Sequence, residues 1–225
     1  MRKKRNHKDN IYVRPELDFK DLEGVLNNYL DVVENYSEIV KDDFCFAYTE
    51  GACVANLASA FIHQGWAALT EYQHTKIHKV KASQNSAGRN DLFVSDGDRG
   101  IYCEAKIGFL DASGEQDKWK GMVERTWQNA HKDMTLSITN RRSDNELGLA
   151  ISFFCVSQQE FDEDKKDEKM NKIWEYCMLP DSDSEFKNEV DAIAWYKVPE
   201  ISEQWKPWYP VGHVVTVKSS KVPLR

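Results

Sequence analysis

Residues 88–107 read GRNDLFVSDGDRGIYCEAKI and decide the fold, because two apolar segments are joined here by a strong turn sequence. The Asp-Gly-Asp turn at 96–98 predicts a β-hairpin whose loop is centred between Gly97 and Asp98. With that centre, Val94 lies opposite Ile101. The stretch therefore predicts two antiparallel strands with a defined register.

This register separates the hairpin into an apolar face and a polar face, because side chains alternate along a strand. The apolar face carries Leu92, Val94, Ile101, Cys103, Ala105 and Ile107. The other face carries Asp91, Phe93, Tyr102, Glu104 and Lys106. A slip of one residue would move the acids into the apolar layer, so the pattern supports the register.

The polar face brings like charges together. Asp91 lies opposite Glu104, with Cβ atoms ~5 Å apart, and like charges in that position destabilise a strand pair. Lys106 follows on the same strand, roughly 6.6 Å from Glu104. A divalent cation between the acids would resolve the repulsion, since Mg²⁺ is held by one or two carboxylates, waters and phosphate oxygens. An amphipathic hairpin with a solvated face, neutralised by Lys106, has the same spacing, and that alternative stays open.

A third acid, Glu50, belongs to a helix expected over 49–65. It precedes Val54 by four residues and Leu57 by seven, which places it on the buried side of that helix. A helix packed on the sheet would bring Glu50 over the acidic face of the hairpin. An acid in a first helical turn also interacts favourably with the helix dipole, which is the simpler reading.

The remaining chain alternates between helical and strand patterns. Apolar spacing predicts helices over about 18–40, 49–65 and 117–134. It predicts strands at 66–73, 91–94, 101–109 and 147–156 and in the segments IAWYKVP and HVVTVK. We expect a single mixed α/β domain over 1–225, with a mixed central β-sheet flanked by helices. An N-terminal helical extension covers 15–40, and additional C-terminal strands lie within 190–218.

Composition limits the class of protein. The chain has 41% apolar residues, a formal charge of −7 and five scattered cysteines without a C-x-x-C pair. These features predict a soluble cytoplasmic protein with reduced thiols and without a membrane partner, since no apolar run reaches ~18 residues. The acidic balance disfavours a general nucleic-acid coat, but the basic segment 73–81 and the basic first eight residues leave local phosphate binding open.

The segment GRNDL (88–92), followed by EAK (104–106) on the next strand, resembles the motif of the PD-(D/E)XK superfamily, the restriction-endonuclease-like nucleases. A helix bearing an acid comes before the motif, and a helix and a buried strand come after it. The resemblance covers about 44–156 and implies a restriction-endonuclease-like core of order α-β-β-β-α-β. Asn90 stands where the family name has proline.

The resemblance implies a role for each matching residue. Asp91 and Glu104 would be metal ligands together with the backbone carbonyl of Ala105, and Glu50 would be the helix acid that completes the site. Lys106 would orient or deprotonate the attacking water and offset charge near the scissile phosphate. The implied cofactor is Mg²⁺, with Mn²⁺ as a substitute. Such a metal supplies a nucleophilic water and stabilises charge on the phosphate.

Further residues are candidates for the accessory and nucleic-acid contacts. Gln128 resembles a glutamine of some branches of the superfamily, and Trp205 and Trp208 are candidates for base stacking or for packing of their loop. The candidate backbone contacts are Lys76, Lys79, Lys81 and Arg89, with the basic N-terminus as an arm. The histidines at 63, 74, 78, 131 and 213 show no metal-binding spacing and are not expected to be ligands.

The resemblance implies a Mg²⁺-dependent endodeoxyribonuclease, which by analogy with the superfamily would act in restriction or in phage or host defence. Its partner would be nucleic acid, DNA in the first instance, and a homodimer or partner protein is compatible with cutting a duplex. One alternative is a catalytically inactive nuclease-fold module that binds nucleic acid or a protein. Another is an α/β interaction protein in which the D…ExK spacing arises by chance.

Overall fold

The computed structural model describes most of the chain. The described residues are 7–17, 19–41, 43–77, 85–114, 116–138, 146–159, 168, 170–173, 176–177, 190–199 and 208–221. Side chains are described throughout these ranges except at 73–77, 85–88, 116, 117 and 221. Lys79 and Lys81 lie outside the described residues.

Seven strands form one mixed sheet in the order β1-β6-β7-β5-β4-β3-β2. The strands are β1 (Ile11–Val13), β2 (Ala67–Ile77), β3 (Asn85–Ser95), β4 (Gly100–Asp111), β5 (Glu146–Gln158), β6 (Ala192–Lys197) and β7 (Tyr209–Lys221). The helices are α1 (Leu22–Ile39), α2 (Glu50–His63) and α3 (Gln116–Ile138), with 3-10 turns η1 (Lys8–Asn10) and η2 (Cys45–Ala47). Only the β4–β5 pair is parallel among the pairs between these strands. The predicted mixed α/β domain is confirmed. Along the chain, the elements from α2 to β5 run in the order α-β-β-β-α-β.

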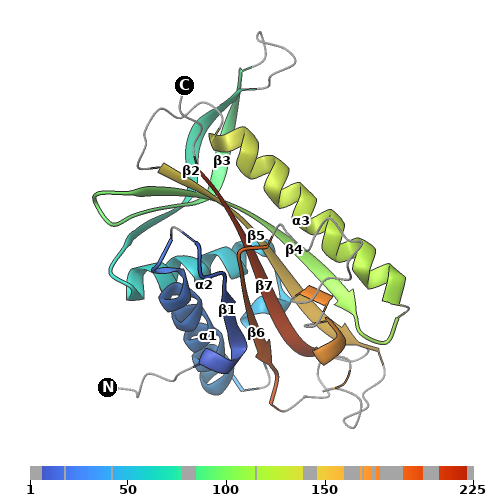
Figure 1. Ribbon diagram of the computed structural model, residues 1–225. Helices are drawn as coiled ribbons and strands as arrows, with labels where there is room; N and C mark the ends of the chain where they lie inside the picture. The colour runs from blue at the N-terminus through green and yellow to red at the C-terminus, as the bar shows by residue number, and fades with distance from the viewer. Residues whose placement is uncertain are drawn as a thin grey trace.

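Helices cover both faces of the sheet, with α1 and α2 on one side and α3 on the other (Figure 1). Leu92, Val94 and Ile101 belong to the core cluster that α1 and α2 bury. Tyr102 belongs instead to the cluster formed with α3, and Phe93 packs against that cluster. The alternation predicted for the hairpin is therefore confirmed on both faces.

Local sequence signals account for the ends of the second helix. The Thr49 side chain accepts a hydrogen bond from the backbone N–H of Ala52 at 3.2 Å and caps α2. Gly65, with φ of +94°, ends the same segment in a left-handed conformation that suits glycine. The first helix begins later than predicted, at Leu22, after an Asp21 whose side chain makes no capping bond.

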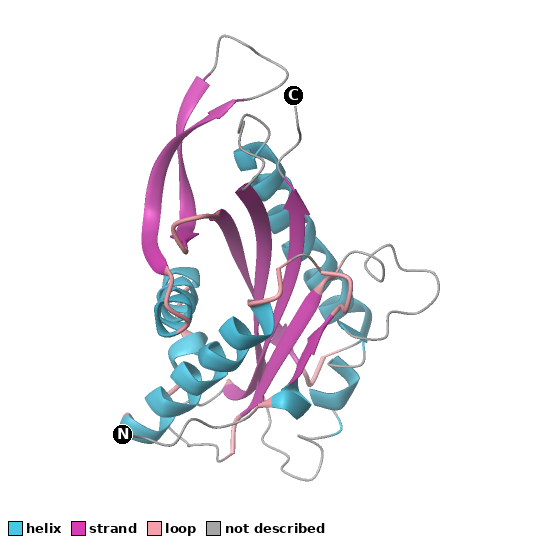
Figure 2. Cartoon of the chain, turned by 60° about the vertical axis from the view of Figure 1, so that its left-hand side comes forward, coloured by secondary structure: helices cyan, strands magenta, loops and turns pink. Residues whose placement is uncertain are grey.

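The hairpin register is confirmed, but the β3–β4 ladder is short. Val94 pairs with Ile101, and the last pair toward the start of β3 is Leu92 with Cys103. From that point β3 continues only with β2, and Figure 2 shows this strand pair standing apart from the other strands. The β2–β3 pairing skips Glu71, which has φ of +53°. Beyond Cys103, therefore, β4 keeps β5 on one side and has an open edge on the other among the described residues.

Two expectations about the class of chain can also be compared with the structure. All five cysteines are buried and free, as the absence of paired spacing predicted. Within the described residues, no helix has the length and apolar character needed to cross a membrane.

Candidate active site

Asp91 lies where β3 leaves β4, and its side chain takes over part of the interrupted ladder. Asp91 Oδ2 accepts a hydrogen bond from the backbone N–H of Ala105 at 2.7 Å. Such a bond to a charged acceptor is stronger than one between neutral groups. The carboxylate therefore satisfies a backbone donor that β3 no longer reaches.

Lys106 satisfies the neighbouring acceptor on the same edge. Its Nζ donates to the backbone carbonyl of Ala105 at 2.8 Å and forms an ion pair with Asp133 Oδ2 of α3 at 3.2 Å. Both charged side chains are partly exposed, at 29% and 35%. The ammonium therefore lies between the open edge of β4 and the helix that covers this part of the sheet.

Glu50 is the first residue of α2 and interacts with the same edge one step further along. Burial raises the pKa of the Glu50 carboxyl, the ammonium of Lys106 lowers it, and the carboxylate of Asp91 raises it again; the net shift is upward. The backbone N–H of Ile107 also interacts with Glu50 and lowers that pKa. At this edge of β4, the favourable interactions of the Glu50 carboxylate with Lys106 and Ile107 therefore do not fully offset its burial and its repulsion by Asp91.

Glu104 is held differently, although it precedes Lys106 by only two residues on β4. Its side chain is buried, and Oε1 accepts hydrogen bonds from Asn90 Nδ2 at 2.8 Å and from Ser137 Oγ of α3. Both donors are buried. A buried carboxylate requires such donors, because desolvation of an unbonded charge is costly. Asn90, the residue before Asp91, therefore supplies a donor to Glu104.

The structure brings Glu50, Asp91 and Lys106 into electrostatic contact and adds Asp133 to them. Glu104 lies on the neighbouring position of the strand, bonded toward α3. Within the described part of the chain, the three predicted acids do not form a group whose ligating atoms all lie within 4.8 Å of one another. The ladder also ends one pair before the expected juxtaposition of Asp91 and Glu104.

The charge state of Lys106 follows from these neighbours. Burial by itself lowers the pKa of the ammonium, but Glu50, Asp91 and Asp133 outweigh it, and the net pKa is raised. Lys106 is therefore a cation at neutral pH in this arrangement. A role as a general base would require neutralisation of the surrounding carboxylates, which a bound divalent cation would provide.

The predicted accessory residues are spread more widely. Arg89 is exposed on β3 and forms an ion pair with Glu71 Oε2 at 2.9 Å. Gln128 is exposed on α3. Lys76 lies on β2, and its side chain is among those that the structure does not describe.

Sequence reasoning missed the contribution of α3. Asp133 and Ser137 are four residues apart, so they share one face of the helix. Lys106 and Glu104 are two residues apart and share one face of β4. Four residues on a helix and two residues on a strand both span about 6 Å. Asp133 can therefore pair with Lys106 while Ser137 pairs with Glu104. This signal was present in the sequence, but it becomes readable only when the crossing point of α3 on β4 is known.

A second charged cluster lies away from this site. His7 Nε2 is 3.1 Å from Asp31 Oδ1 and 3.7 Å from Glu34 Oε2. The possible ligand atoms of these three side chains all lie within 4.8 Å of one another, which is close enough to hold a metal ion. The hydrogen bond between His7 and Asp31 also attaches the segment before β1 to the surface of α1. His7 was not considered among the histidines at the level of sequence.

Comparison with known proteins adds no relative to this geometry: no family model, no curated protein and no solved structure matches the chain.

The oxygen atoms at the open edge suit a hard divalent cation. Asp91 bonds the N–H of Ala105 and Glu50 interacts with the N–H of Ile107, so both carboxylates lie at the strand edge that also presents the Ala105 carbonyl. Mg²⁺ and Mn²⁺ prefer carboxylate, carbonyl and water ligands. The hydrogen bonds at Ala105 support this fit, because they place the Asp91 carboxylate and the Ala105 carbonyl at the same open edge. A bound cation there would also offset the burial and the repulsion by Asp91 that raise the pKa of Glu50. In the structure, the ammonium of Lys106 interacts with both carboxylates and with Asp133.

Proposed function

We propose that this chain is a metal-dependent nuclease that hydrolyses phosphodiester bonds, in DNA in the first instance. The observation that supports this most is the meeting of Glu50, Asp91 and Lys106 at the open edge of β4, where the strand offers its own carbonyl at Ala105. These groups come from a helix and two strands, so rigid elements position them.

Asp91, Glu50 and the Ala105 carbonyl would hold the cation, and Glu104 would join them from the adjacent strand position. When bound, Mg²⁺ or Mn²⁺ would supply a nucleophilic water and stabilise charge on the phosphate. Asn90 and Ser137 would then act as positioning residues, because they orient the Glu104 carboxylate. Outer donors of this kind typically change metal affinity by ~10–100-fold when they are removed.

Lys106 would interact with the scissile phosphate as a cation. Its hydrogen bond to Ala105 and its ion pair with Asp133 fix the ammonium beside the proposed metal ligands. A metal would compete with Lys106 for the Ala105 carbonyl, and a substrate phosphate would offer the ammonium a new partner. Both would release Lys106 from that carbonyl. The lysine then offsets negative charge where it develops during hydrolysis.

Incubation with nucleic acid tests the proposal directly. Purified protein is mixed with supercoiled plasmid, single-stranded DNA and RNA, each with Mg²⁺, Mn²⁺ or EDTA. We expect cleavage that requires metal and falls at least ~100-fold in Glu104→Gln and Lys106→Ala, as for loss of a group that stabilises the transition state. Lys132→Ala serves as the matched control, since Lys132 is an exposed lysine on α3 next to Asp133.

The His7 cluster requires its own control, because it could bind the added metal independently. His7→Ala should cleave like the wild type if the proposed site carries the reaction. Cleavage that is absent from the wild type under every condition, or equal in all four variants, would show that the chain is not a nuclease of this type.

A nuclease-fold module that binds without cleaving is the second candidate. Two contacts favour it: Lys106 Nζ occupies the Ala105 carbonyl, and Asn90 and Ser137 both engage Oε1 of Glu104. An inactive module would retain binding of labelled DNA in an anisotropy titration and would show no metal-dependent cleavage.

A further inference from the structure

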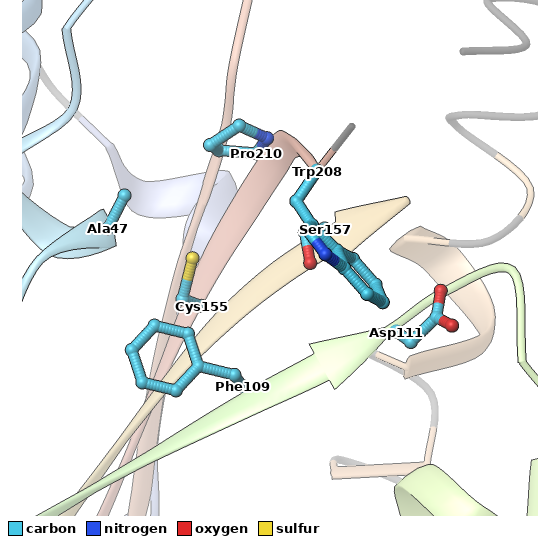
Figure 3. A pocket seen from close by; sticks show the side chains of 7 residues that line it. All are labelled: Ala47, Phe109, Asp111, Cys155, Ser157, Trp208 and Pro210. Atoms are coloured by element: carbon cyan, nitrogen blue, oxygen red, sulfur yellow. The ribbon is translucent and has the colours of Figure 1, made fainter. Parts of the chain in front are cut away.

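A pocket of about 370 Å³ opens at the carboxyl ends of β4 and β5, beside η2 and the start of β7 (Figure 3). Its lining residues are Ala47, Phe109, Asp111, Cys155, Ser157, Trp208 and Pro210. Phe109 is 50% exposed and Trp208 is 44% exposed. Two large aromatic side chains thus present their surfaces to a cavity of the size range that ligand sites have.

The pocket adjoins the candidate active site along two chain segments. Phe109 follows Lys106 by three residues on β4, roughly 10 Å at ~3.3 Å per residue, so the two side chains leave the strand on opposite faces. The Lys106 ammonium nevertheless bends to the open edge of β4, where it donates to the Ala105 carbonyl, and this edge can be reached from the face that carries Phe109. Ala47 precedes Glu50 by three residues at the entrance to α2. A ligand in the pocket would therefore extend from its aromatic walls toward the open edge where Lys106 and Asp91 lie.

The polar groups of the pocket favour hydrogen-bond donors over phosphate. Asp111 contributes a carboxylate, and Ser157 contributes a hydroxyl that donates to the carbonyl of Leu110 at a long 3.5 Å. The β5–β7 register shifts between Val156 and Ser157, and bulges of this kind redirect side chains. An ionised carboxylate only accepts hydrogen bonds and repels phosphate, so it suits the N–H groups of a base edge.

We propose that this pocket binds one unpaired nucleobase of the nucleic acid whose phosphate lies at Lys106. The base stacks on Phe109 or Trp208 and directs its N–H edge to Asp111. In a duplex, pairing and stacking cover both the edge and the faces of a base, so the pocket selects single-stranded or unpaired positions. The substrate class named here rests on the proposed function, but the pocket would bind in the same way in a module without nuclease activity.

Binding without cleavage tests this assignment. The full-length protein is titrated in EDTA against a fluorescein-labelled 12-nucleotide single strand and, separately, against the duplex of the same sequence. We expect Phe109→Ala and Trp208→Ala to weaken single-strand binding by about 5–150-fold, the equivalent of ~1–3 kcal/mol for loss of stacking on one base. Trp208→Phe should retain most of the affinity, because an aromatic face remains.

Tyr12→Ala is the matched control, since Tyr12 is an exposed aromatic residue on β1, at the opposite edge of the sheet. Thermal melts establish that each variant is folded. A loss of less than fivefold in both pocket variants overturns the proposal, as does an equal loss for the duplex. The titration measures binding and not cleavage, so it can be interpreted even if the nuclease assay is negative. If the wild type cleaves DNA and the pocket variants bind the single strand as tightly as the wild type, the pocket proposal is overturned and the proposed nuclease function is not.

Discussion

Replacement of Asp91 separates a structural role at the edge of β4 from a chemical role in the site. In Asp91→Ala, the backbone N–H of the buried Ala105 loses its acceptor at 2.7 Å. An unsatisfied buried donor costs ~1–3 kcal/mol. In a chain of this length each kcal/mol corresponds to ~2–4 °C in Tm, so we expect a fall of about 2–12 °C.

Asp91→Asn keeps an oxygen at the same position and removes the charge. Its carbonyl oxygen can accept from Ala105, so we expect a Tm within ~2 °C of the wild type, because the hydrogen bond remains. Metal-dependent cleavage should disappear in both variants, since neither offers a carboxylate to the cation. Circular dichroism melts and the plasmid assay measure the two effects separately.

Two results would refute this reasoning. Equal destabilisation of the Asn and Ala variants would show that charge, and not the hydrogen bond to Ala105, stabilises the edge. Full activity of Asp91→Asn would show that the carboxylate does not hold the metal.

Four other substitutions test the packing and the polar contacts around the sheet. In Gly108→Ala the new Cβ would lie 2.9 Å from the hydroxyl oxygen of Thr126 on α3, so we expect the free energy of unfolding to fall by ~1–3 kcal/mol. Gly121 is exposed on α3 with open space around it, so Gly121→Ala should raise the free energy of unfolding by ~0.5–1 kcal/mol. Urea denaturation measures both changes. Burial lowers the pKa of His213 to about 3, below its ordinary ~6.5. Between pH ~3 and pH ~6.5, the unfolded chain therefore binds a proton at His213 that the folded chain does not. This contribution to the free energy of unfolding is complete above pH ~6.5 and should fall by ~1.4 kcal/mol per pH unit on acidification. Denaturation at pH 7 and pH 5 should show this decrease, and His213→Gln should lack it. Ser137→Ala removes a donor to Glu104 and should weaken Mn²⁺ binding by at least ~10-fold in calorimetry, and unchanged affinity would remove Ser137 from the site.

The register of the hairpin could be predicted because two independent signals agreed on it. The turn at 96–98 set the pairing of Val94 with Ile101, and the alternation of apolar and polar residues set the faces. Both signals are local, so they require no knowledge of the rest of the fold. The same holds for the ends of α2, where Thr49 and Gly65 act on their own helix.

The departure of β3 from β4 could not be predicted from these signals. The alternation of apolar and polar residues continues through Asp91, and the pattern gives no sign that the ladder ends at Cys103. The bend coincides with Glu71 in a left-handed conformation, a choice that glutamate does not favour and that the surrounding structure must impose. The pairing of Glu104 with Ser137 depends in the same way on where α3 crosses the sheet.

The open edge of β4 also bears on the solubility of the protein. An unpaired strand edge exposes backbone groups that can template pairing with another chain, and natural proteins protect such edges with charged side chains. Asp91 and Lys106 occupy the donor and the acceptor of Ala105, so the residues proposed for chemistry also block intermolecular strand addition. Variants that lose both charges should self-associate.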